Sequence, residues 1–130
     1  MFNVSLTIHA WTGGLPAPEG ISWWFARKYN GGGIASLGYT AFPVATPGDE
    51  GDLDGDGVNE LDEIESGYGF MQLEFFRAYG VLGQQYLGEC WGSAVSSYTD
   101  HYKIPYERWH IHTIQSFVLL GDPSLRIGGY

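Results

Sequence analysis

The first 40 residues carry the pattern that most limits the fold, because two strand-like segments flank a short helix-like one. Residues 3–9, NVSLTIH, alternate apolar and polar side chains, which predicts a half-buried strand. The segment ISWWFARKY predicts a short helix that stops at Asn30 and Gly31, residue types that tolerate a left-handed cap. Residues 33–39, GIASLGY, predict a second strand. Such a βαβ unit makes the two strands parallel neighbours.

Helical spacing dominates the second half of the chain. Residues 68–79 predict one helix, and the residues from 82 to 98 predict another, with one apolar face. That face is formed by Leu82, Tyr86, Leu87, Cys90, Trp91, Ala94, Val95 and Tyr98. Residues 107–122 fit both a helix and a strand, and a helix is favoured; residues 124–128, SLRIG, predict a final strand. With 44% hydrophobic residues, the chain can form one domain over residues 1–130, of the α/β class.

The negative charge of the chain is concentrated in one segment. The formal net charge is -9, and residues 49–65 contain nine of the 15 acidic residues and no Lys or Arg. The remaining six acids balance the six basic residues, so residues 49–65 read as an acidic insertion in a near-neutral domain. This balance excludes nucleic acid as a partner. The sequence has no apolar run of about 18 residues, so no membrane span is expected.

Residues 52–63, DLDGDGVNELDE, match the pattern of a calcium loop. Calcium takes six to eight oxygen ligands, so carboxylates at alternate positions wrap the ion while a glycine permits the sharp turn. Without a counter-ion, carboxylates converging at this spacing would repel one another. The sequence therefore predicts calcium as cofactor. The predicted ligands are Asp52, Asp54, Asp56, the backbone carbonyl of Val58 and Glu63, with Gly57 at the turn and Glu60 at the ninth position.

The stretch DGDGVNELDE, residues 54–63, resembles the calcium repeats of dockerins and of thrombospondin-type extracellular modules. In those families the ion pins a surface loop rather than switching a sensor. The resemblance implies a structural calcium site in a secreted, extracellular protein. One function consistent with it is a calcium-dependent binding or assembly module without enzymatic activity.

No catalytic nucleophile stands out from the residues alone. Cys90 could act as a nucleophile with His101, His110 or His112 as base, but it lies in the middle of the predicted apolar helix face. A free cysteine in such a place usually serves as a small hydrophobic side chain, which favours a core role. If their segment were a strand, His110 and His112 would share a face and could form a zinc site with His9.

Three stretches resemble the gingipain-like cysteine peptidases. NGGGIASLGYT, residues 30–40, is similar to the glycine-rich strand after their catalytic loop, and VLLGDPSLRI, residues 118–127, is similar to the stretch that closes their catalytic domain. LGECWGSAVSSY, residues 87–98, resembles the helix before that ending. The resemblance implies a partial caspase-like fold with a mostly parallel sheet flanked by helices, carrying the calcium loop as an insertion. The chain would be the C-terminal half of such a domain.

The same resemblance implies a catalytic His and Cys at the ends of neighbouring strands. The matching segment, residues 5–14, has Ile8, His9, Ala10 and Trp11 where the family has its Cys, and the catalytic His would lie before Met1. We therefore assign no catalytic residue. The first functional hypothesis is a fragment or degenerate portion of a secreted peptidase, inactive in proteolysis alone and holding a structural calcium ion.

This hypothesis also implies partners. The chain begins directly in a predicted strand, as a piece of a longer polypeptide would, so the missing N-terminal half of the peptidase domain is one expected partner. A second copy is another, because an unpaired strand edge favours a strand-swapped homodimer. A peptide substrate is expected only in the complete enzyme, with Trp11 and the 38–46 loop nearest to it.

Overall fold

The computed structural model describes residues 2–4, 21–40, 48–49, 51–102 and 108–128. The elements in chain order are β1 (Phe2–Val4), α1 (Ile21–Arg27), β2 (Ala35–Tyr39), α2 (Asp62–Glu65), α3 (Gly67–Gly80), α4 (Leu87–His101), α5 (Arg108–Ser116) and β3 (Phe117–Gly121). Trp11, His9 and most of the 38–46 loop lie outside the described residues.

The sheet is mixed, with strand order β1-β2-β3. β1 and β2 pair in parallel, as the βαβ pattern predicts, but β2 and β3 pair antiparallel from Ala35–Gly121 to Tyr39–Phe117. The predicted mostly parallel sheet, and with it the caspase-like fold class, is therefore wrong. The direction follows from where the chain enters β3. The backbone N–H of Thr40 donates to the carbonyl of Ser116, so β3 begins where β2 ends.

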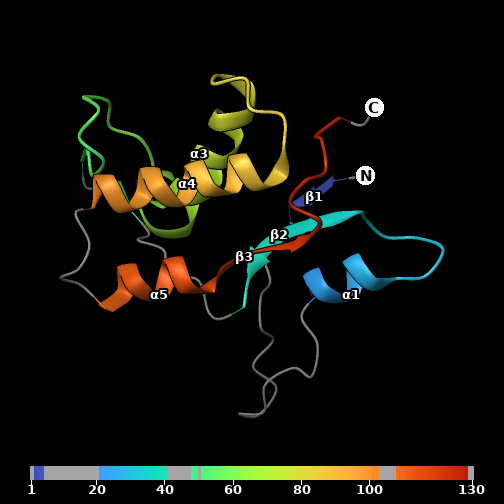
Figure 1. Ribbon diagram of the computed structural model, residues 1–130. Coiled ribbons are helices and arrows are strands. Elements are labelled where there is room, and N and C mark those ends of the chain that lie inside the picture. Colours follow the sequence, from blue (N-terminus) through green and yellow to red (C-terminus); the bar gives the residue numbers. More distant parts are fainter. Residues whose placement is uncertain (1, 5–20, 41–47, 50, 103–107, 129–130) are drawn as a thin grey trace, which may run out of the picture.

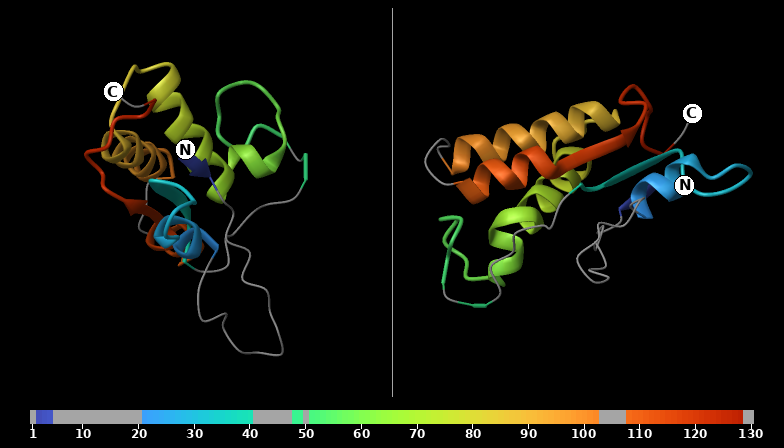
Figure 2. Two further views of the ribbon diagram at one scale, coloured as in Figure 1. Left: turned by 90° about the vertical axis from the view of Figure 1, so that its right-hand side faces the viewer. Right: turned by 90° about the horizontal axis from the view of Figure 1, so that it is seen from below.

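Helices lie on both sides of the sheet (Figure 1). In that view α1 lies below the strands, and α4 lies above them with α3 behind it. The right panel of Figure 2, seen from below, shows α4 and α5 running side by side, and Tyr98 of α4 contacts His110 of α5. The central strand β2 is buried along its whole length. Among the described residues the core comprises Ala35, Leu37, Tyr39, Phe70, Met71, Phe75, Ala78, Leu87, Cys90, Ala94, Tyr98 and Phe117.

Local signals predicted most helices well. The helix expected over residues 68–79 is α3, and α1 is followed by Asn30 with a φ of 57°, in the predicted left-handed conformation. The helix expected from Leu82 begins only at Leu87, and Leu82 itself is exposed. Among the described helices, none has the length and apolar character needed to cross a membrane.

The end of the chain differs from the prediction. Residues 117–121 form β3 instead of continuing the helix, because pairing with β2 buries Phe117. Gly121 allows this close approach, since an added Cβ would lie 2.8 Å from the Cβ of Ala35. Residues 124–128 form no strand, and Arg126 makes an isolated bridge with Tyr86.

Candidate metal site in the acidic loop

Three carboxylates converge at one end of the helical layer. Carboxylate oxygens of Asp52, Asp54 and Glu65 all lie within 4.8 Å of one another. Asp52 is exposed, Asp54 is half-buried and Glu65 is buried. Figures 1 and 2 show the loop, in green, projecting beside the start of α3. This cluster could hold a metal ion.

The loop is folded around the side chain of Asp52. One of its carboxylate oxygens accepts hydrogen bonds from the backbone N–H groups of Gly55 (2.6 Å) and Asp56 (3.1 Å), and the other accepts from Gly57 (2.9 Å). Gly55 and Gly57 have φ values of 74° and 92°, which L side chains rarely adopt. The predicted turn at Gly57 is therefore confirmed, and its cause is a chain that wraps back onto one carboxylate.

Glu65 joins the two ends of the loop. Its side chain accepts a hydrogen bond from the backbone N–H of Leu53 (2.9 Å) on one oxygen and from that of Glu60 (2.6 Å) on the other. Glu65 is only 1% exposed, so these bonds hold a buried carboxylate beside Asp52 and Asp54. Each carboxylate oxygen has two lone pairs, so an oxygen that accepts one N–H can still bind a cation.

The predicted ligands have different places in this arrangement. Asp52 and Asp54 lie in the cluster. The carboxylates of Asp56 and Glu63 do not belong to it; Asp56 accepts a hydrogen bond from the backbone N–H of Val58 at 2.8 Å, and Glu63 is exposed. Val58 would contribute its backbone carbonyl. Their role as ligands stays a prediction.

Sequence reasoning missed Glu65 because it followed the fixed spacing of the loop, which ends at Glu63. The signal that could have found it is the spacing on α2, where Asp62 and Glu65 are three residues apart and share a face. Both acids are buried, whereas Leu61 is 60% exposed and Ile64 is 38% exposed. This reversal of the usual pattern shows that the polar face of α2 turns inward.

The electrostatics of the cluster favour a cation. Partial burial, followed by the negative charges of Asp56, Glu65 and Asp52, raises the pKa of the Asp54 carboxyl above its ordinary value, although a backbone hydrogen bond opposes the shift. The negative form of Asp54 is therefore less favourable in this environment than in water. A bound cation would offset both the repulsion and the desolvation.

Cys90 is a core residue, as its position on the apolar helix face predicts. It is 0% exposed, and its Sγ contacts the backbone carbonyl of Gln84 at 3.7 Å. Burial, with a smaller contribution from Glu89, raises the pKa of the thiol. This environment disfavours the thiolate that a cysteine nucleophile requires.

The two histidines of α5, His110 and His112, lie in different environments. His110 is buried, and its Nδ1 lies 2.8 Å from the hydroxyl of Tyr98, whereas His112 is exposed. Their segment is a helix, so the condition under which His110 and His112 would share a face, and could form a zinc site with His9, is not met. His110 serves instead in the aromatic packing of the helical layer.

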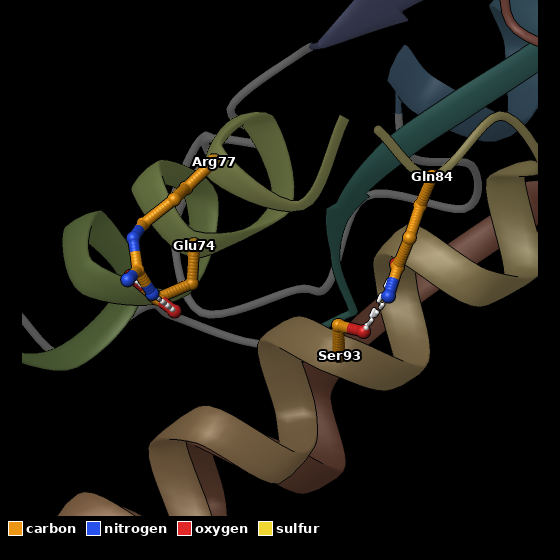
Figure 3. A network of polar contacts seen from close by, with 4 residues as sticks. All are labelled: Glu74, Arg77, Gln84 and Ser93. Carbon is orange, nitrogen blue, oxygen red and sulfur yellow. Dashed lines mark hydrogen bonds and ion pairs between the residues drawn. The ribbon is translucent and has the colours of Figure 1, made fainter. Parts of the chain in front are cut away.

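A groove of about 510 Å³ lies between α3 and α4. Figure 3 shows two polar pairs along it, Glu74 with Arg77 and Gln84 with Ser93. The first is an ion pair at 3.2 Å and the second a hydrogen bond at 2.7 Å. These groups satisfy one another, so the acidic loop is the stronger candidate for a functional site.

Comparison with protein-family models, with curated proteins and with solved structures found no match for this chain.

Proposed function

We propose that residues 52–65 bind one calcium ion, and that the ion stabilises the fold rather than taking part in catalysis. The observation that carries the proposal is the convergence of Asp52, Asp54 and the buried Glu65. Carboxylate oxygens are ligands for hard cations such as calcium and magnesium. Calcium fits better, because it accepts irregular sets of oxygens that include backbone carbonyls, and the loop pattern of residues 52–63 is one that calcium uses.

A structural role follows from what the loop is attached to. Glu65 holds the loop from Leu53 to Glu60 and is itself the last residue of α2, directly before Ser66 and α3. An ion at Glu65 would therefore tie the loop to the helical layer. Since the ion would bind the folded state only, it would raise the free energy of unfolding. The loop's resemblance to extracellular calcium repeats supports a secreted location, where calcium is plentiful.

Calorimetric titration of calcium-free protein with calcium tests this proposal. Saturable binding of one ion per chain is expected, with magnesium bound more weakly because it demands a regular octahedral set of ligands. An absence of binding at millimolar calcium would contradict it.

We propose a second function, as part of a gingipain-like peptidase that is inactive in proteolysis on its own. The support is the sequence resemblance of residues 30–40 and 118–127. These stretches contain β2 and most of β3, which pair antiparallel and not as in the parallel sheet of that family. The gene sequence upstream of Met1 tests it. A coding segment with a His in a strand-ending position is expected, and an unrelated gene there would contradict the proposal.

A further inference from the structure

The cation cluster is joined to the far end of α4 by one hydrogen bond. The hydroxyl of Tyr102, the residue that caps α4, donates to the backbone carbonyl of Glu65. The two residues are 37 positions apart in the sequence. Glu65 is thus fixed through its main chain by Tyr102 and through its side chain by the loop.

The position of the Tyr102 ring is set by three helices. The ring stacks on His110 of α5 with centroids 4.6 Å apart, and it packs against Tyr98 of α4 at 4.6 Å and Phe70 of α3 at 5.6 Å. His110 is held in turn by its contact with the Tyr98 hydroxyl. Such packing leaves the ring little rotational freedom, so the Tyr102 hydroxyl is placed before any ion binds.

We propose that Tyr102 is a positioning residue for the cation site, which sets calcium affinity by fixing the backbone of Glu65. This inference rests on the proposed calcium function. If the hydrogen bond is lost, Glu65 gains freedom at the point where its carboxylate must face Asp52 and Asp54. Binding must then restore that order, which lowers affinity. Because coupling is reciprocal, calcium in turn stabilises the contact between α2 and the end of α4.

The electrostatics agree with this geometry. Burial raises the pKa of the Tyr102 hydroxyl, and the charges of Tyr98, Asp54 and Glu65 raise it further, in that order. The Tyr102 hydroxyl therefore lies close enough to the cluster to interact electrostatically with the carboxylates of Asp54 and Glu65.

Tyr102→Phe tests the proposal, because it keeps the ring and removes only the hydroxyl. Calcium affinity should fall about fivefold, because this factor corresponds to the net free energy that one ordinary hydrogen bond contributes. Tyr39→Phe is the matched control. It removes another tyrosine hydroxyl that donates to a backbone carbonyl, that of Tyr68 at 3.1 Å, in a buried position outside the cluster. Its calcium affinity should stay within about twofold of wild type, although its stability also falls.

The outcomes separate this inference from the calcium function itself. If wild type binds calcium and Tyr102→Phe binds it equally well, the positioning role is wrong. If wild type does not bind calcium, the proposed function fails first. Should Tyr102→Phe not fold, hydrogen exchange of the wild-type chain decides. Calcium should slow exchange of the Tyr102 backbone N–H, which donates to Tyr98, and protection confined to the loop would overturn the inference.

Discussion

Glu65→Gln should abolish the calcium-induced rise in melting temperature. At a calcium concentration about 100 times the dissociation constant, binding adds about 2.7 kcal/mol to the wild-type free energy of unfolding. For a chain of this size that corresponds to a rise of about 10 °C. The variant removes the negative charge of the buried Glu65 side chain. It also replaces one carboxylate oxygen, which accepts hydrogen bonds, by an amide NH2 group, which donates them. The melting temperature of the variant should therefore show almost no rise in calcium. Thermal unfolding in calcium and in chelator measures the difference.

Glu63→Gln is the matched control, because it makes the same chemical change two residues earlier on an exposed side chain. If the cluster of Asp52, Asp54 and Glu65 supplies the carboxylate ligands, this variant should keep the full response to calcium. This pair also separates the ligand that the loop spacing predicts from the one that the structure brings into the cluster. A response lost in Glu63→Gln and kept in Glu65→Gln would show that the spacing identifies the ligand and that the cluster does not.

Gly69→Ala should destabilise the protein by about 2–4 kcal/mol, even though alanine is normally the better helix former. Gly69 lies in the first turn of α3, where the helix crosses the backbone of α2. An added Cβ would lie 1.7 Å from the carbonyl oxygen of Glu63, so the two backbones would have to separate. Chemical denaturation monitored by circular dichroism measures the loss.

The comparison for this variant is Gly92→Ala in α4. Nothing lies within 4 Å of a Cβ added at Gly92, so this substitution should stabilise the protein by about 0.5–1 kcal/mol. Equal stability of the two variants would mean that α2 and α3 do not cross as closely as described. The pair therefore tests the junction that places Glu65.

Local sequence signals predict those parts of the fold that local chemistry decides. The apolar spacing of residues 68–79 gives α3, and Asn30 adopts the left-handed conformation expected after α1. In the loop, the alternation of aspartate and glycine predicts the turn at Gly57 and the convergence of Asp52 and Asp54. Each of these features depends on contacts within a few residues.

The errors concern contacts between distant parts of the chain. Residues 117–121 have the composition of a buried helix as well as of a strand, and only pairing with β2, almost 80 residues earlier, makes them β3. The antiparallel direction has the same origin, because it depends on the end of β2 at which α5 delivers the chain. Glu65 was missed because its place is set by the short helix α2 and by the hydrogen bond from Tyr102.

The most direct test of the account is the number of calcium ions bound by calcium-free wild-type protein, measured by isothermal titration calorimetry. One ion per chain, with a saturable heat that chelator removes, is the result predicted from the cluster of Asp52, Asp54 and Glu65. No heat of binding at millimolar calcium would contradict the account, because the acidic loop would then be stable through its hydrogen bonds alone.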